Sequence, residues 1–293
     1  MQKERKLQNY LLENPNRLKD GYLKLAERFG LTYDEAKEAA SVLNKTVTIK
    51  RPKKVFPKKI KETDLKPFLN GDKKNVLIIG DTHIPFERQG YLEHCRNIQE
   101  QYNCGTVVHI GDVVDNNYSS YHETDPDGKS AGDELGLAIG RLKDWYKVFP
   151  KVKVCLGNHD QIIQRKAFSS GLSKRWIKGL NEVLEVPNWD FDLEYEINDV
   201  VYTHGTGNSG ETAAYKRALN RRKSIVSGHL HTTANINWNV SDVDKIFAMN
   251  VGCGIDDKQY CFNYAKNFTK KSIVSCAVVL NNGKLPIIIP MEL

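Results

Sequence analysis

The sequence has no long hydrophobic segment, no paired-cysteine motif and no internal repeat. Its 293 residues contain no apolar run near the roughly 18 residues that a membrane-spanning helix requires. The charged start, Met1 to Lys6, is not followed by an apolar segment of the signal-peptide type. The six cysteines lack CxxC spacing, which favours buried free thiols over disulfides or a zinc ribbon. We therefore expect a cytoplasmic protein that makes no contact with a membrane.

Positive charge is concentrated in the first quarter of the chain. Residues 1–74 contain 19 Lys and Arg against 10 Asp and Glu, whereas the remainder contains 24 against 26. The net charge of +7 therefore originates entirely before residue 75. Because a basic arm gains affinity for a polyanion by releasing counterions, nucleic acid is the favoured partner and DNA the leading choice. The sequence leaves any protein partner unknown.

Composition predicts three parts: a helical module over residues 1–49, a basic linker over residues 50–74 and a large domain over residues 75–293. Pro52 and Pro57 interrupt the linker and disfavour helix in the residues before them. Its basic residues are Lys50, Arg51, Lys53, Lys54, Lys58, Lys59 and Lys61. Such a linker is expected to be extended, and its charge serves either solubility or binding to a polyanion.

The N-terminal module has the spacing of three short helices. Helical periodicity extends from Lys3 to Glu13 and from Gly21 to Phe29, and a third helix is expected to begin near Tyr33. Thr32 and Glu35 form a capping-box pattern at that start.

The connection between the second and third helices resembles a helix-turn-helix, the supersecondary motif of many DNA-binding proteins. Ala26 is small where the two helices must cross, and Gly30 follows it by four residues. The same pattern occurs in small bundles that bind proteins. Asp34 and Glu35 would also repel phosphate unless they cap the helix, so DNA and protein contact both remain open.

The rest of the chain alternates strand-like and helix-like patterns. The apolar or β-branched runs cover Asn75 to Ile79, Thr106 to Ile110, Val152 to Leu156, Val200 to Thr203 and Ser224 to Val226. The helical patterns cover Gln89 to Gln101, Asp133 to Phe149, Leu172 to Leu184 and Glu211 to Arg222. This alternation predicts an α/β domain, in which sites are normally built at the carboxyl ends of the strands.

Each strand-like run is followed at once by polar residues, within the strings GDTH, GDVVD, GNHD, THG and GHLH. These strings contribute Asp81, His83, Asp112, Asp115, Asn158, His159, Asp160, His204, His229 and His231. Carboxylate, imidazole and amide donors in this mixture suit two transition metals bound side by side. Two ions about 3.5–4 Å apart need a bridging ligand, and Asp112 is the candidate. The expected nucleophile is a metal-bound hydroxide in a hydrolytic site.

The five strings, in this order, resemble the signature of the calcineurin-like metallophosphoesterase superfamily from about Asn75 to the C-terminus. The resemblance implies a four-layer α-β-β-α sandwich of two mixed sheets flanked by helices, after a small helical N-terminal domain. It implies one metal bound by Asp81, His83, Asp112 and His231, and a second bound by Asp112, Asn158, His204 and His229. Mn²⁺ is the expected ion at both positions, with Fe, Zn, Ni or Co as alternatives. It also implies that His159 is the general acid and that Asp115 orients the His159 imidazole.

Departures from the family pattern narrow the subclass. The serine/threonine protein phosphatases of the superfamily have Arg after the second Asp of GDxxD and Glu after GNH, whereas this chain has Asn116 and Asp160. The missing guanidinium favours the phosphodiesterase and nuclease branches. A compensating phosphate contact is expected from a basic segment that could also be a solvated helix face, and His122, in the loop after Asp115, is a separate candidate for substrate contact. That segment contains Lys216, Arg217, Arg221, Arg222 and Lys223.

Two function classes therefore remain open. The first is a metal-dependent nuclease or phosphodiesterase whose N-terminal module brings it to DNA or RNA. The second is a phosphatase or phosphodiesterase of a small nucleotide, whose module serves protein contact or regulation. A structural metal site in a DNA-binding regulator is disfavoured, because such a site would not require His159. The combination of module and domain resembles proteins of bacterial viruses.

Overall fold

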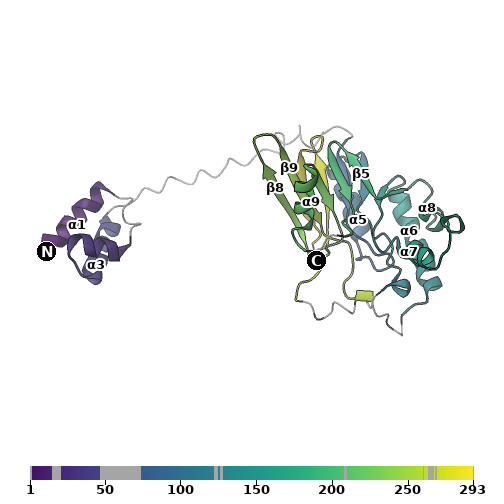
Figure 1. Cartoon of the computed structure of the whole chain (residues 1–293), viewed down its shortest axis with the longest axis horizontal. Coiled ribbons are helices and arrows are strands. Elements are labelled where there is room, and N and C mark those ends of the chain that lie inside the picture. The colour runs from purple at the N-terminus through teal and green to yellow at the C-terminus, as the bar shows by residue number, and fades with distance from the viewer. Residues whose placement is uncertain are drawn as a thin grey trace. The chain divides into compact units, whose positions relative to one another are not determined.

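Figure 1 shows the computed structural model of the chain, which divides into two compact units, Met1–Lys61 and Glu62–Leu293. The structure describes residues 2–14, 21–46, 74–121, 125, 128–207, 210–259, 261–262, 267 and 269–292. Of the expected basic linker, only Lys74 lies within the described residues. The extended conformation of that linker therefore stays a prediction.

The first unit contains the three expected helices. They are α1 (Gln2–Glu13), α2 (Tyr22–Phe29) and α3 (Tyr33–Thr46). Their apolar faces meet in a small core of Leu7, Leu11, Leu25, Ala26, Ala36, Ala39 and Ala40. Alanine dominates the α3 face of this core, which lets the helix backbones approach closely.

The turn between α2 and α3 is fixed by local hydrogen bonds. Gly30 ends α2 in the left-handed region at φ 61°, a conformation that glycine adopts without a steric cost. The Thr32 backbone N–H donates to the Glu35 Oε2 at 2.8 Å, and the Glu35 N–H donates to the Thr32 Oγ1 at 3.4 Å. These contacts confirm the capping box, and the pKa of Glu35 is lowered by the hydrogen bond from the Thr32 backbone.

The second unit contains two mixed β-sheets. One has the strand order β11-β10-β1-β2-β3-β4 and the other the order β5-β6-β7-β9-β8. Strands β1 to β4 are parallel to one another, as are β6, β7 and β9. The strands are β1 (Val76–Ile79), β2 (Thr106–His109), β3 (Lys153–Cys155), β4 (Asp190–Asp192), β5 (Glu194–Ile197), β6 (Val200–Thr203), β7 (Ser224–Ser227), β8 (Ala234–Val240), β9 (Lys245–Val251), β10 (Ser275–Leu280) and β11 (Leu285–Pro290).

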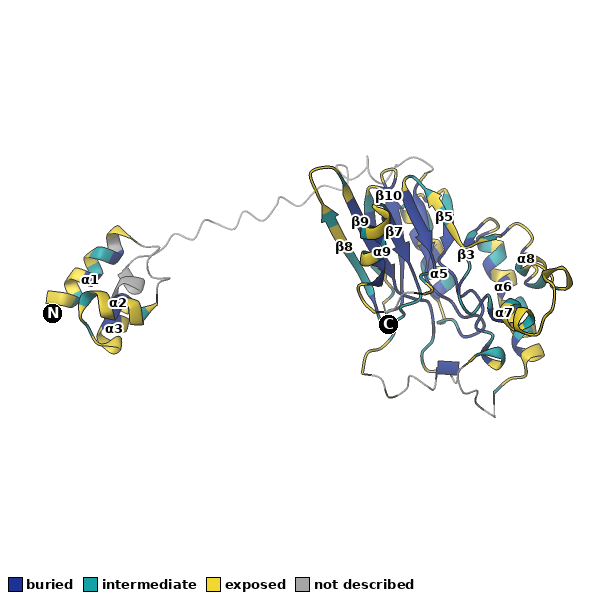
Figure 2. Cartoon of the chain, in the orientation of Figure 1, coloured by how far each residue is buried: buried dark blue, intermediate teal, exposed yellow. Residues whose placement is uncertain are grey.

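Helices cover the outer faces of both sheets, which gives the expected four layers. The α-helices are α5 (Tyr91–Gln101), α6 (Ala131–Val148), α7 (Ile162–Ser169), α8 (Leu180–Val183) and α9 (Ala213–Arg221), and the 3-10 helices are η2 (Asn117–Ser119) and η3 (Lys174–Trp176). Because side chains alternate along a strand, Val76 and Ile78 of β1 face the second sheet while Leu77 and Ile79 face α5 and α6. Figure 2 shows the sheets as the buried centre of this unit.

The prediction of a single helix over Leu172 to Leu184 is wrong. The chain instead forms α7, which the sequence pattern missed, followed by the short η3 and α8. The Ser173 side chain caps η3 by accepting from the Arg175 N–H, and Ile177 is extended at φ −110° and ψ 128°. An extended residue between two turns cannot continue a helix, so the apolar spacing there reflects packing against α6 and β4 rather than one helical face.

Further observations concern the cysteines and the helices. All six cysteines are free and buried. No helix among the described residues is long and apolar enough to cross a membrane. The other helices of the second unit lie within a few residues of their expected positions.

Candidate metal centre

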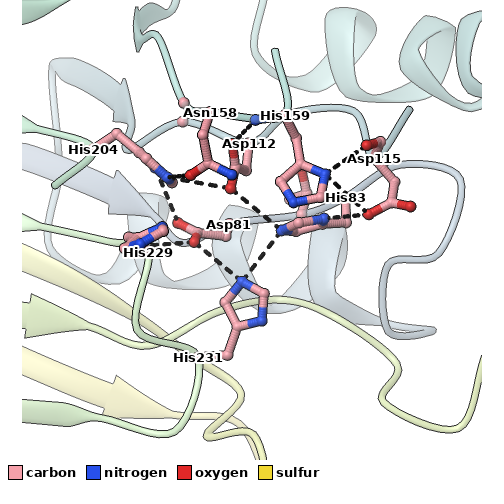
Figure 3. Close-up of polar contacts among 12 residues, drawn as sticks. Asp81, His83, Asp112, Asp115, Asn158, His159, His204, His229 and His231 are labelled. Atoms are coloured by element: carbon pink, nitrogen blue, oxygen red, sulfur yellow. Dashed lines mark hydrogen bonds and ion pairs between the residues drawn. The ribbon is translucent and has the colours of Figure 1, made fainter. Parts of the chain in front are cut away.

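The polar strings meet at one edge of the two sheets (Figure 3). Asp81, Asp112 and Asn158 follow the parallel strands β1, β2 and β3, while His204 and His229 follow β6 and β7. Parallel strands bring their carboxyl ends to the same edge, and the packing of the sheets brings the two edges together. The fold therefore assembles donors that are far apart in sequence.

Three of these residues have an unusual backbone conformation, which sets the direction of their side chains. His83, Asp112 and His229 have positive φ values of 47°, 48° and 69°. Non-glycine residues rarely adopt this left-handed region, and where they do the surrounding structure must compensate the cost. The strain is therefore located at the donors themselves.

Two glycines are required by close approach. A Cβ at Gly157 would lie 2.0 Å from the Asp112 Oδ1, and a Cβ at Gly228 would lie 2.2 Å from the Asp81 Oδ1. Neither distance is possible for a methyl group. Gly157 and Gly228 thus each make room for a carboxylate of a different motif, in addition to permitting the turn expected from the sequence.

The first donor group combines Asp81, His83 and His231, whose ligand atoms lie within 4.8 Å of one another. The Asp81 Oδ2 lies 3.3 Å from the His231 Nε2, and the His83 Nε2 lies 3.2 Å from the same nitrogen. The His83 Nε2 also lies 3.6 Å from the Asp112 Oδ2. Asp112 therefore adjoins the first group.

The second donor group combines Asp112, His204 and His229. The His204 Nε2 lies 3.2 Å from the Asp112 Oδ2 and 3.1 Å from the Asn158 Oδ1. Asp112 is thus within reach of both groups, as a bridging carboxylate must be. Every metal ligand expected from the sequence lies in one of the two groups or beside it.

Hydrogen bonds on the far side of two imidazoles fix which nitrogen can bind a metal. The His83 Nδ1–H donates to the Asp115 Oδ1 at 2.5 Å, and the His204 Nδ1–H donates to the Ile110 carbonyl at 3.0 Å. In both rings the Nε2 is left without a proton in the neutral form, which is the state that binds a metal.

The charge distribution also fits cations. Asp81 is fully buried, and its Oδ1 has no hydrogen-bond partner among the described residues. Burial lowers the pKa of His204, but the negative charges of Asp112 and Asp81 outweigh burial and raise this pKa to about 10. The negative charge of these buried carboxylates, which raises the pKa of His204, would be compensated by bound metal ions. The mixture of oxygen and nitrogen donors suits transition metals.

His159 lies beside the donors, with one ring nitrogen within 4.8 Å of ligand atoms of His83 and Asp112. Its backbone N–H donates to the Asp112 Oδ1 at 2.8 Å, and its Nδ1–H donates to the Asp115 carbonyl oxygen at 2.6 Å. Burial lowers the pKa of His159, but the charges of Asp112 and Asp115 outweigh this effect and the pKa is raised. The ring is therefore held with its Nε2 available and its protonated form favoured.

Asp115 contacts two histidines of the site. The family resemblance implies that its carboxylate orients His159. The Asp115 Oδ1 lies 3.6 Å from the His159 Nδ1, within ion-pair distance, and it also accepts a hydrogen bond from the His83 ring. Asp115 thus contacts the metal donor His83 through its side chain, and His159 through both its side chain and its main-chain carbonyl. The sequence places Asp115 at the site but does not distinguish these two partners.

Asp160 supports the loops and does not join the donors. Its Oδ1 accepts from the Val113 N–H at 3.0 Å, and its Oδ2 accepts from the Gly157 N–H at 2.9 Å. Burial raises the pKa of Asp160 to about 6. The side chain thus ties the loop after β3 to the loop after β2.

A cavity of about 260 Å³ opens above the donors. Its lining includes His83, Asp112, Asn158, His159, His229 and His231 together with Phe262, Lys270 and Lys271. The last three residues follow β9 in a segment without a recognisable motif, so the sequence pattern did not identify them. The two lysines supply positive charge near the place where a phosphate would lie, although Lys270 also forms an ion pair with Glu211.

The substrate contacts expected from the sequence are distributed differently. Arg221 forms an ion pair with Glu194 at 2.6 Å, and Arg222 forms one with Asp244. Arg217 donates to the carbonyl oxygen of Thr206 at 3.2 Å, next to the loop that follows His204. His122 lies outside the described residues. Two of the three arginines are thus neutralised by carboxylates, as in the solvated-face alternative.

Residues 74–252 match the sequence profile of the calcineurin-like phosphoesterases. No curated protein matches the chain. Similar solved structures include vacuolar protein sorting 29 from Cryptosporidium parvum, at 14% identity and a TM-score of 0.40 over 76% of this chain and 92% of that one. The E. coli phosphoesterase Yfce is 15% identical, with a TM-score of 0.38 over 73% and 98%. The Pseudomonas putida nuclease MPE is 11% identical, with a TM-score of 0.33 over 74% and 87%.

Proposed function

Because the chain belongs to the calcineurin-like phosphoesterase family, we propose that it is a metal-dependent phosphodiesterase that hydrolyses nucleic acid. The family makes it a hydrolase of phosphate esters. The observation that carries the proposal is the pair of donor groups beside Asp112, with the His159 ring at their edge. A second candidate is a phosphodiesterase of a small nucleotide, which the open cavity would also admit.

The residues of the site have separate roles in this reaction. Two divalent ions bound by the donor groups, with Mn²⁺ as the proposed ion, would polarise the phosphoryl oxygens and lower the pKa of a bound water. Asp115 holds the His83 ring in its ligand tautomer. His159, fixed through its Nδ1, gives a proton from its Nε2 to the leaving oxygen.

The residues that line the cavity favour a phosphodiester substrate over a phosphomonoester. No arginine lines it among the described residues, and Asn116, which stands where protein phosphatases have Arg, donates instead to the His159 carbonyl at 3.1 Å. A dianionic monoester is normally held by a bidentate guanidinium, whereas a monoanionic diester needs less compensation. The positive charge at the cavity comes from Lys271 and from Lys270, which also pairs with Glu211. This amount of positive charge suits the single negative charge of a diester.

The proposed function predicts hydrolysis of both linear DNA and bis(p-nitrophenyl) phosphate by the Mn²⁺-loaded chain. Chelation should abolish both activities, because both require the same donor-bound ions. Product release from DNA is followed on a denaturing gel and nitrophenolate by absorbance. Hydrolysis of the chromogenic diester without any cleavage of DNA or RNA would move the assignment to the small-nucleotide candidate.

The N-terminal unit is proposed to bind DNA through its helix-turn-helix-like pattern and the basic segment after it. The position of the Glu35 carboxylate on the Thr32 cap supports this, because the carboxylate there completes the helix start. The adjoining charge is large, since residues 1–74 hold the whole positive excess.

Removal of residues 1–74 should weaken duplex binding and leave hydrolysis of bis(p-nitrophenyl) phosphate nearly unchanged. The intact chain should show log K falling with log salt by about 0.9 per phosphate neutralised, and the fragment beginning at Asn75 should show a smaller slope. Fluorescence anisotropy at several salt concentrations measures both. Equal affinities and slopes would remove DNA from the role of this unit and favour protein contact.

A further inference from the structure

Residues 161–178 form a basic segment directly after the catalytic loop. They include α7 and η3 and contain Arg165, Lys166, Lys174, Arg175 and Lys178, with no Asp or Glu. This composition contrasts with the domain as a whole, where acidic residues slightly outnumber basic ones. Figure 2 shows α7 with much of its surface exposed.

Among the described residues, only one of the five basic side chains of this segment has a carboxylate partner. Within the described residues, Lys178 pairs with Glu182 at 2.7 Å, and none of the other four basic side chains forms an ion pair. The contrast with α9 is direct, because Arg221, Arg222 and Lys223 there each have a carboxylate partner. The segment around α7 therefore offers a positive field to an external anion.

Aromatic side chains lie among these charges and face solvent. Phe168 is 80% exposed and Trp176 is 83% exposed, while Tyr118 and Tyr121 are 60% and 64% exposed. Arg165 and Lys166 lie over the Tyr121 ring at 5.2 and 5.6 Å from its centroid, which ties the loop after η2 to α7. Large aromatic groups this exposed on a folded domain indicate a contact surface.

This surface is continuous with the catalytic loop. A cavity of about 230 Å³ lies beneath it, lined by Asn116, Tyr118, Asp160, Ile163, Ile177 and Lys178 among others. Asn116 and Asp160 both contact the loop that carries His159. The Glu134 Oε1 accepts from the Asn117 N–H at 2.8 Å and holds η2 against α6. An extended ligand on the surface would thus reach the side of the reaction centre where His159 lies.

We propose that residues 161–178, with Tyr118 and Tyr121, form a binding surface for single-stranded nucleic acid. The inference rests on the proposed function and names its substrate class. Exposed aromatic rings stack on unpaired bases, and the basic side chains between them contact the phosphates. Bases in a duplex have no free faces, so the aromatic part of the surface selects single strands. A second copy of the chain is the competing occupant, but copies with this unbalanced charge repel one another.

The test measures binding of a fluorescein-labelled oligothymidylate and of a labelled duplex by anisotropy. All chains are full length, loaded with Mn²⁺ and carry His159→Ala to slow cleavage. The doubly substituted chain Phe168→Ala, Trp176→Ala should bind the single strand at least about tenfold more weakly, since each stacked base contributes roughly 5- to 150-fold. Its affinity for the duplex should be unchanged. Lys174→Gln with Arg175→Gln should lower the single-strand salt slope by about 1.4.

Trp238→Ala with Lys245→Gln is the matched control. Trp238 is a partly exposed aromatic residue with the Lys245 ammonium 4.6 Å from its ring centroid, and both lie in the second sheet. This variant should bind the single strand like the parent. Melting temperatures of all variants should agree, because the replaced side chains are at the surface.

Three results would overturn the inference. They are an unchanged single-strand affinity in the Phe168→Ala, Trp176→Ala chain, an equal loss on single strand and duplex, and a loss equally large in the Trp238 control. Sedimentation would assign the surface to contact with a second copy of the chain if the aromatic substitutions dissociated a dimer and left oligonucleotide binding unaltered. Failure of the His159-intact chain to hydrolyse bis(p-nitrophenyl) phosphate would count against the proposed function and leave the binding result standing.

Discussion

Replacement of Asp112 by Asn is expected to reduce hydrolysis of bis(p-nitrophenyl) phosphate by more than about 10³-fold. Loss of a single electrostatic donor from an active site typically costs 10²–10³-fold, and Asp112 lies within reach of both donor groups. The Asn amide is neutral, so its oxygen would bind two cations far more weakly than the charged Asp112 carboxylate does. Initial rates at saturating Mn²⁺ measure the loss.

Asp144→Asn provides the matched control for this substitution. Asp144 is an exposed carboxylate on α6 that pairs with Lys147 at 2.9 Å and belongs to neither donor group. The variant should retain the parent rate, because an exposed ion pair contributes little to stability. Near-parent activity in Asp112→Asn would instead show that Asp112 does not bridge.

Replacement of His159 by Ala is expected to depend on the leaving group. Hydrolysis of a dinucleotide, with its poor alkoxide leaving group, should fall by about 10²–10⁴-fold, whereas bis(p-nitrophenyl) phosphate should be affected far less. Nitrophenolate leaves without protonation, so the proton that His159 supplies is needed least there. Steady-state rates on the two substrates measure the difference.

His94→Ala controls for the removal of an imidazole as such. His94 lies on α5 with its Nε2 3.3 Å from the Ile289 carbonyl oxygen, outside the donor groups. This variant should hydrolyse both substrates at parent rates. An equal fall on both substrates in His159→Ala would give His159 a role in metal binding or positioning rather than proton transfer.

The metal-binding side chains can be predicted from the sequence, because both the end of a strand and the type of donor residue are visible in a short stretch of chain. A short apolar run such as Val76 to Ile79 indicates a buried strand, and the residues after it must lie at the edge of the sheet. The apolar runs ahead of Asp81 and Asp112 therefore suffice to predict that these two carboxylates lie close together. The order of the five motifs adds the family resemblance, which the match over residues 74–252 confirms.

Other features depend on contacts that a sequence does not show. Asp115 has His83 and His159 on either side, and its Oδ1 lies 2.5 Å from the Nδ1 of the first ring and 3.6 Å from that of the second. Lys270 and Lys271 reach the cavity through a segment after β9 that has no periodicity to read. The helix expected over Leu172 to Leu184 failed because Ser173 caps a separate short turn.

The ion pairs of the basic segments could not be predicted from the sequence either. Lys216 to Lys223 is a basic run in the sequence, yet Glu194, Glu196 and Asp244 come from β5 and the β8–β9 turn to balance it. Residues 161–178 have similar charge, but among the described residues only Lys178 there has a carboxylate partner. Only the fold distinguishes a neutralised basic face from one that is open to a ligand.

The most direct test of the account is the metal content of the full-length chain and of Asp112→Asn. Elemental analysis after Mn²⁺ loading and gel filtration should give two ions per parent chain, because two donor groups adjoin Asp112. Asp112→Asn should lose ions at both positions. Two ions retained in a fully active Asp112→Asn chain, or a single ion in a fully active parent, would contradict the two-metal centre.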